Sequence, residues 1–271
     1  MLSQVTAEIV QDLDVADGWM LLLDGVPNSY LDLADPTRLE FEYQQWMARA
    51  VDLHTSAGPL AVVHVGGGAC AFPRYIAATR PDARQLVAEY DPELIALVRE
   101  VFGVRTGPGM RIRAGDGRDV LAGQRTDSAN LVVRDAFVGP IVPPHLTTTE
   151  FLIDVARVLR PDGLYLANVT DGPPLTLAKA EVATARASFP HVALVSEAPV
   201  LKGRRYGNLS LLASPAPLPT EDLTRLLARS VAPTRVLAGD ELDRFTAGAA
   251  VTTDSEPLTP PQRPSHLGGW G

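Results

Sequence analysis

The sequence predicts an α/β fold in which a mostly parallel sheet carries helices on both faces and follows a small β-domain. From residue 60 onward, short apolar runs alternate with helical segments across short links, which is typical of a parallel sheet covered on both faces. The first 38 residues instead show short runs separated by turn signals, which predicts antiparallel strands. The 271 residues suffice for one large domain with a small appendage.

The small domain is expected to span residues 1–38 and to contain three strands. Strand-like runs stand at residues 8–13, 18–25 and 26–35. The turn sequences ADG and DGVPN separate these runs. A helix is expected to follow, because apolar residues recur at helical spacing at Leu39, Tyr43, Trp46, Met47 and Ala50.

The main domain is expected to span residues 39–250, with strands and helices in alternation. Strands are expected at residues 60–65, 83–90, 110–117, 129–137, 164–171, 191–198 and 206–214. Helices are expected at residues 71–81, 92–103, 150–163 and 175–190, with one or two more within 220–247. The last two strands are close in sequence and are expected to form an antiparallel edge pair. Residues 251–271 form a tail rich in proline and glycine, and its end is expected to dock loosely or to be disordered.

Charge, cysteine content and apolar run length bound the function. The net charge of −8 argues against a nucleic-acid partner, since phosphate binding requires a basic surface. With Cys70 as the single cysteine and five scattered histidines, we expect neither a disulfide nor a metal site. The first residues lack the basic region of a signal peptide, and no apolar run approaches the roughly 18 residues of a membrane span. A soluble cytoplasmic protein without a membrane partner is therefore expected.

Four successive strands of the main domain are predicted to end in a glycine cluster or an acid. The carboxyl ends of parallel strands meet at one edge of the sheet, where doubly wound folds bind their ligands. We therefore expect these residues to line one ligand site. They are Gly66, Gly67 and Gly68 after the first strand, Glu89 after the second, Asp116 and Gly117 after the third, and Asp135 after the fourth.

Each of these residues also has a purely structural interpretation. The glycines can simply make a tight turn, and Asp116 can either accept the adenine amino group or serve as a turn residue. Glu89 stands where an acid accepts hydrogen bonds from ribose hydroxyls, whereas Asp91 is expected to cap the helix opened by Pro92. The ordered set indicates a nucleoside ligand more strongly than any one member does.

The sequence resembles the spermidine synthase family of aminopropyltransferases over roughly residues 18–213. The stretches that carry the resemblance include VVHVGGGACAFPRYI, VAEYDPELIALVREVFG, IRAGDGRDVL and, most specifically, DAFVGPIVPPHLTTTEF. The resemblance implies a methyltransferase-like Rossmann domain behind the small β-domain, and a homodimer. It also implies aminopropyl transfer from decarboxylated S-adenosylmethionine, a nucleoside sulfonium, to a small-molecule amine, with no tightly bound cofactor.

The resemblance implies a role for each matched residue. Asp135 matches the catalytic acid, which either accepts a proton from the attacking amine or orients it, and Tyr43 lies near the nucleophile. Gln44 matches a polar residue on the substrate side. Asp171 ends a later strand at the same edge, and from this position it is expected to bind substrate. The positions that match the family's nucleoside-binding residues are Gly66, Gly67, Gly68, Glu89, Asp116 and Gly117.

Three positions depart from the family pattern, and each departure removes a carboxylate. Ala69 stands where the family has an acid directly after the glycines, and Val138 replaces a second aspartate in the catalytic loop. Leu39 precedes Glu40 where the family has an Asp-Glu pair. Putrescine is a dication, so a pocket without these acids is expected to hold it poorly.

Three functions stay open from the sequence. The first is aminopropyl transfer, and the second is methyl transfer from intact S-adenosylmethionine. Ala69 favours the second slightly, because an acid there would repel the carboxylate of that donor. The third is a catalytically silent protein that keeps the nucleoside site. His145 and Glu150 could replace lost polar contacts, although Glu150 is expected to cap the helix that follows the loop.

Overall fold

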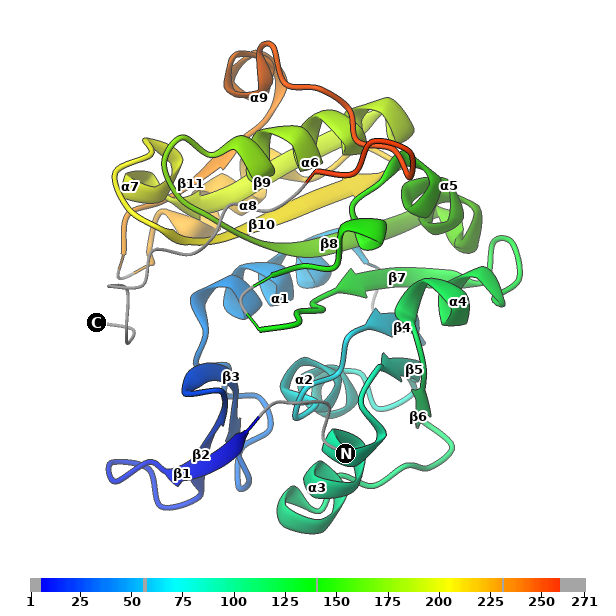
Figure 1. Cartoon of the computed structure of the whole chain (residues 1–271), viewed down its shortest axis with the longest axis vertical. Helices are drawn as coiled ribbons and strands as arrows, with labels where there is room; N and C mark the ends of the chain where they lie inside the picture. The colour runs from blue at the N-terminus through cyan, green and yellow to red at the C-terminus, as the bar shows by residue number, and fades with distance from the viewer. Residues whose placement is uncertain (1–5, 56–57, 140, 231, 259–271) are drawn as a thin grey trace.

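The computed structural model describes residues 6–55, 58–139, 141–230 and 232–258, which build two separate sheets (Figure 1). The small sheet is antiparallel in the order β1-β2-β3, and Figure 1 shows it in blue at the lower end of the molecule. This arrangement confirms the predicted N-terminal β-domain. Its strands are β1 (Ala7–Gln11), β2 (Gly18–Leu23) and β3 (Val26–Asp32).

The main sheet has eight strands in the order β11-β9-β10-β8-β7-β4-β5-β6. The five strands from β8 to β6 in this order run parallel, which confirms the predicted mostly parallel sheet. Both β8 and β9 pair antiparallel with β10, and β11 pairs antiparallel with β9. The strands are β4 (Ala61–Val65), β5 (Arg84–Glu89), β6 (Met110–Ala114), β7 (Ala129–Arg134), β8 (Leu159–Asp171), β9 (His191–Glu197), β10 (Gly207–Ser214) and β11 (Thr234–Leu237).

The antiparallel edge differs from the prediction in one respect. Strands β9 and β10 do pair, but β10 lies inside the sheet between β8 and β9. The edge is instead formed by β11, which interrupts a region expected to hold helices alone. The four residues of β11 are too few to show a strand period, and their place at the edge depends on pairing with β9.

Helices cover the main sheet on both faces, as predicted. Val63 and Val65 of β4 join a hydrophobic cluster with α5 and α6, whereas Val62 joins one with α1, α2 and α8. Alternate residues of a strand point to opposite faces, so the two clusters lie on opposite sides of the sheet. Within the described residues, no helix has the length and apolar character to cross a membrane. The helices are α1 (Glu42–His54), α2 (Ala71–Thr79), α3 (Pro92–Phe102), α4 (Gly117–Ala122), α5 (Thr149–Val158), α6 (Thr176–Ser188), α7 (Ala198–Leu201), α8 (Thr220–Leu227) and α9 (Gly239–Thr246), with a 3-10 turn at Pro144–Leu146.

The helix caps confirm one prediction and correct another. The carboxylate of Asp91 accepts hydrogen bonds from the backbone N–H groups of Glu93 and Leu94, at 2.9 and 3.3 Å, and so caps α3 as predicted. At α5 the cap is Thr148, not Glu150. The carboxylate of Glu150 instead accepts the backbone N–H of Asp254 at 3.0 Å, which ties the start of α5 to the C-terminal segment.

A buried ion pair joins β7 to α6 next to the carboxyl edge. The guanidinium of Arg134, the last residue of β7, is fully buried and donates to the carboxylate of Glu181 and, at 3.1 Å, to the hydroxyl of Tyr165. Burial raises the pKa of Glu181 to about 7, while the positive charge of Arg134 acts in the opposite direction. The pair anchors the residue that directly precedes Asp135.

The described C-terminal residues pack against the loop before α5. The buried Thr252 donates its hydroxyl to the carbonyl of Thr147 at 2.7 Å and accepts the backbone N–H of Thr149 at 2.9 Å. Asp254 forms two hydrogen bonds of 2.8 Å with the guanidinium of Arg118. This part of the predicted tail is therefore held in place. The Pro/Gly-rich end, residues 259–271, lies outside the described residues.

Candidate active site

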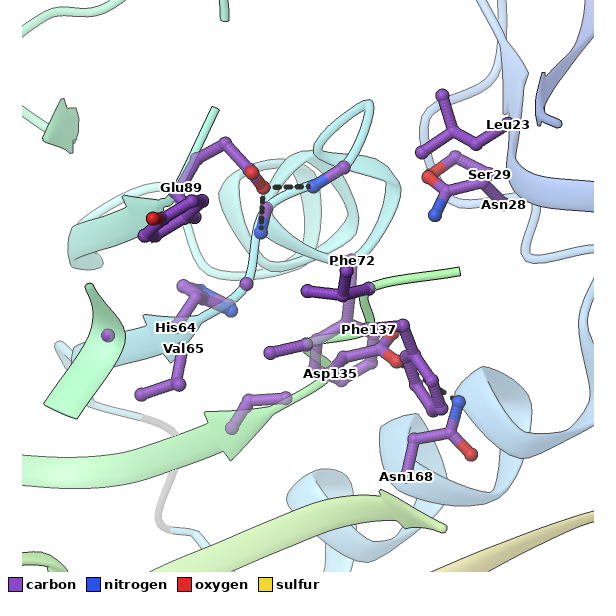
Figure 2. A pocket seen from close by; sticks show the side chains of 18 of the residues that line it. Leu23, Asn28, Ser29, His64, Val65, Phe72, Glu89, Asp135, Phe137 and Asn168 are labelled. Carbon is purple, nitrogen blue, oxygen red and sulfur yellow. Dashed lines mark hydrogen bonds between the residues drawn. The ribbon is translucent and has the colours of Figure 1, made fainter. Parts of the chain in front are cut away.

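A cavity of about 560 Å³ opens at the carboxyl ends of β4, β5, β7 and β8 and is closed on one side by β3 (Figure 2). Parallel strands place their carboxyl ends at a common edge, so residues far apart in the sequence meet here. The structure brings nearly all of the predicted site residues to this wall. Those that line the cavity are Tyr43, Gln44, Gly66, Gly67, Gly68, Glu89, Asp116, Gly117 and Asp135.

Asp135 is the centre of a hydrogen-bonded cluster in this cavity. One carboxylate oxygen accepts the hydroxyl of Tyr43 at 2.8 Å, and the other accepts the side-chain amide of Asn168 at 3.0 Å. The carboxyl faces the cavity yet is surrounded by protein, and the resulting desolvation raises its pKa above the usual aspartate value. The two neutral donors act against this shift by stabilising the charged form. The arrangement suits a carboxylate that takes up a proton.

Tyr43 supplies one of these donors and is itself held in place. It lies in the first turn of α1, and the side-chain amide of Gln44 donates to its hydroxyl at 3.3 Å. Burial, together with the negative charge of Asp135, raises the pKa of Tyr43 well above its ordinary value. The phenol therefore stays protonated and keeps donating to Asp135 at physiological pH.

Asn168 is the site residue that the sequence interpretation missed. It lies near the end of β8, and its side chain is 3 % exposed and faces the cavity (Figure 2). Its amide nitrogen donates to Asp135, whereas its side-chain oxygen is buried without a hydrogen-bond partner among the described residues. The sequence does contain one indication of such a residue, because Asn168 is a polar amide within the otherwise apolar run LYLANV. The part of Asn168 in the cluster is therefore the hydrogen bond that its amide nitrogen gives to Asp135.

Glu89 holds the glycine loop through backbone hydrogen bonds. One of its carboxylate oxygens accepts the N–H groups of Gly67 and Gly68 at 2.9 and 3.0 Å, as Figure 2 shows, and the other accepts the N–H of Asp91 at 3.1 Å. A carboxylate offers about four acceptor positions, so one remains for a ligand hydroxyl. The predicted ribose contact is compatible with this geometry, but the carboxylate also shapes the loop.

The glycines are required by the protein itself as well as by any ligand. At Gly66, which has a φ of +94°, a Cβ atom would overlap the backbone carbonyl of Asp135. At Gly68 a Cβ would lie 2.7 Å from the hydroxyl oxygen of Ser29 in β3. The tight-turn alternative is therefore part of the explanation, because the glycine loop must pass closely between the loop after β7 and the small sheet.

Asp116 caps α4 and contacts the loop before α5. Its carboxylate accepts the backbone N–H of Arg118 at 2.8 Å, and its other oxygen lies 2.8 Å from Nε2 of His145. The turn alternative is thus realised, while the residue still lines the cavity. A Cβ on Gly117 would overlap Val65, so this glycine allows α4 to approach β4.

Asp171 does not join the cluster, which corrects the expectation that it binds substrate. Its side chain is 1 % exposed and is absent from the cavity wall. The carboxylate accepts the backbone N–H groups of Gly172 and Ala178 at 2.8 and 2.9 Å. It therefore fixes the turn from β8 into α6, although its sequence position at the strand end resembles that of Asp135.

The positions that depart from the family pattern carry no charge into the cavity. Ala69 is fully buried, does not line the cavity, and donates its backbone N–H to the hydroxyl of Ser29 at 3.1 Å. Val138 lines the cavity and is 63 % exposed.

His64 also lines the wall, where burial lowers its pKa to about 4, so its imidazole is neutral at physiological pH.

Comparisons with known proteins align nearly the whole chain with a solved structure. A probable spermidine synthase from Corynebacterium glutamicum is 36% identical, with a TM-score of 0.87 and 97% of each chain covered. Human methyltransferase-like protein 13 in complex with SAH is 20% identical, with a TM-score of 0.59 over 79% of this chain and 96% of that one. The second likeness concerns the fold alone. No family model matches the sequence.

Curated relatives match a shorter stretch. The polyamine aminopropyltransferase of Chromobacterium violaceum is 30% identical over 145 residues, which is 53% of this chain and 54% of the relative. That of Vibrio vulnificus is 26% identical over 133 residues, or 48% and 44% of the two chains. The matched stretch therefore spans about half the length of these relatives.

Proposed function

This chain belongs to the spermidine synthase family, and we propose that it transfers an aminopropyl group from decarboxylated S-adenosylmethionine to an amine. The observation that carries the proposal is the cluster of Tyr43, Asp135 and Asn168 inside the cavity. The same cavity contains the glycine loop and Glu89, which suit the nucleoside part of the donor. In this proposal the donor and the proton acceptor share one cavity.

The proposed donor site lies along the first three strand ends. Glu89 would use its remaining acceptor position for a ribose hydroxyl, and the glycine loop would pass beside the ribose and sulfonium. Asp116 and the backbone around it would bind the adenine end. The sulfonium would be positively charged and near partly buried carboxylates, so the site favours a cationic donor over its neutral product.

The proposed reaction is a displacement at carbon. The lone pair of a neutral amine forms the new N–C bond while the C–S bond breaks, and its electron pair leaves on sulfur as a neutral thioether. The new ammonium passes a proton to the carboxylate of Asp135. Because the sulfonium is already a good leaving group, most of the rate comes from alignment and from this proton acceptance.

The substitution Tyr43→Phe is expected to move the acidic limb of the kcat/KM profile to higher pH. Transfer requires the ionised carboxylate of Asp135, whose pKa burial raises and the hydroxyl of Tyr43 lowers. Removal of that hydroxyl lets the pKa of Asp135 rise further, so activity at acid pH falls more than at alkaline pH. Wild type and variant are compared with the same amine, so that the amine's own titration is common to both. An unchanged limb would contradict the assigned hydrogen bond.

A second candidate is methyl transfer from intact S-adenosylmethionine. The specific observation is that Asn28 and Ser29, which face the glycine loop, are neutral, and that the buried Ala69 adds no acid. This side of the glycine loop therefore lacks the additional acid that would repel the carboxylate of the intact donor. The cluster around Asp135 fits both reactions, since each releases a proton from an attacking nucleophile.

Titration calorimetry with decarboxylated S-adenosylmethionine, intact S-adenosylmethionine and methylthioadenosine separates these candidates. The proposal predicts that the decarboxylated donor binds most tightly. The described lining residues include carboxylates but no lysine or arginine, so the carboxylate of the intact donor would have no cationic partner. Tighter binding of the intact donor would favour methyl transfer. Binding of none of the three would contradict both enzyme proposals.

A further inference from the structure

We propose that the amine acceptor is a monoamine, with one amino group on an apolar or uncharged remainder, and not an α,ω-diamine. This inference rests on the proposed aminopropyl transfer and specifies its acceptor class. It follows from the charges that the cavity can present to the acceptor, and from the polar and apolar groups beside Asp135.

The cavity wall holds few carboxylates. Among the described residues that line it, the acids are Glu89, Asp116 and Asp135. The residues outside the described ranges contain no aspartate or glutamate side chain, so none of them can add one. Two of the three acids are already engaged: Glu89 accepts three backbone N–H groups, and Asp116 accepts one and contacts His145.

The proposed donor site uses Glu89 for the ribose and Asp116 for the adenine end, so Asp135, held by Tyr43 and Asn168, is the acid that faces the reacting groups. In the transfer it takes the proton released by the attacking nitrogen. The donor also brings its own ammonium at the end of the aminopropyl chain. A diamine would add a second permanent ammonium, and the described wall holds no carboxylate beyond Asp135 and the two acids assigned to the donor. A buried cation without an anionic partner is strongly disfavoured.

The surface around Asp135 instead suits one N–H group and an apolar remainder. The side-chain amide of Asn168 holds the carboxylate of Asp135, which lines the cavity and can accept one N–H of the attacking amine. Phe41, Phe72 and Phe137 line the same cavity as Asp135, and Figure 2 labels the last two of these rings. These rings can cover an alkyl or aryl group, whose burial is favourable in proportion to its apolar area.

The test compares matched acceptors with decarboxylated S-adenosylmethionine as donor. Methylthioadenosine release is measured with n-butylamine, benzylamine and putrescine, because this product does not depend on the acceptor. We expect kcat/KM for n-butylamine to exceed that for putrescine by about tenfold or more, the effect of one unpaired charge. Equal or better turnover of putrescine would overturn the monoamine inference alone. If none of the three amines supported methylthioadenosine release, the proposed function would be overturned, and this inference with it.

A variant that adds one carboxylate tests the charge argument directly. Val138 lines the cavity and is 63 % exposed, so Val138→Asp is expected to fold and to raise the ratio of putrescine to n-butylamine turnover about tenfold. Val251→Asp is the matched control, because Val251 is 43 % exposed in irregular backbone away from the cavity wall. The inference would be contradicted if the ratio of putrescine to n-butylamine turnover stayed unchanged in Val138→Asp, or if it rose equally in Val251→Asp.

Discussion

Replacement of Asp135 by asparagine is expected to lower the transfer rate by roughly 10²- to 10⁴-fold, the usual contribution of a positioned proton acceptor. The amide keeps the size of the carboxyl and can still meet Tyr43, but it cannot take up the proton released by the attacking amine. Methylthioadenosine release measures the rate.

Binding of the donor separates this effect from misfolding. Since Glu89 and the glycine loop hold the nucleoside part in the proposed site, methylthioadenosine should still bind to Asp135→Asn with an affinity close to that of the wild type. Asp82→Asn makes the same chemical change and is a suitable surface control, because Asp82 is exposed and does not line the cavity. Activity of Asp135→Asn within a few-fold of the wild type would remove Asp135 from the catalytic role.

Breaking the buried pair between Arg134 and Glu181 is expected to lower the free energy of unfolding by about 3–5 kcal/mol. The substitution Arg134→Met leaves the buried carboxyl of Glu181 without its cation. Stability is typically about 5–15 kcal/mol, so such a loss is a large fraction of the total. Urea unfolding measures it, and a loss below about 1 kcal/mol would contradict the assigned pair.

The loss of stability in Arg134→Met is expected to depend on pH. Burial holds the pKa of Glu181 above its ordinary value of 4.5, and the loss of Arg134 removes the charge that lowers it. Below pH 4.5 the carboxyl is protonated in both folded and unfolded chains, so the penalty is smallest there and grows as the pH rises. Arg134→Met/Glu181→Leu, which removes both charges, should recover most of the stability.

The fold was predictable from the sequence because its main signals are local. Strand-like runs alternate with helical segments, and the caps Asp91 and Gly103 mark the ends of α3. The prediction for the edge of the sheet was wrong. The four residues of β11 are too few to show the alternation of a strand, and their position depends on pairing with β9. The predicted homodimer and cytoplasmic location stay predictions of the resemblance and the composition.

The site was predictable in its acids and glycines but not in what those residues do for the fold. Strand ends located Glu89, Asp116 and Asp135, since the topology brings them to one edge. Asp171 has the same sequence context, yet two backbone N–H groups capture its carboxylate in the turn before α6. The contact of Ser29 with Ala69 joins residues 40 positions apart, and a local sequence pattern cannot predict contacts of this kind.

The most direct measurement of the central claim gives the protein an equal mixture of decarboxylated and intact S-adenosylmethionine together with n-butylamine. Mass spectrometry then identifies the sulfur product and the modified amine. Aminopropyl transfer predicts methylthioadenosine and an N-aminopropyl amine, with both products formed at least about 10²-fold more slowly by Asp135→Asn. S-adenosylhomocysteine and an N-methyl amine as the main products would contradict the account and assign the cavity to methyl transfer.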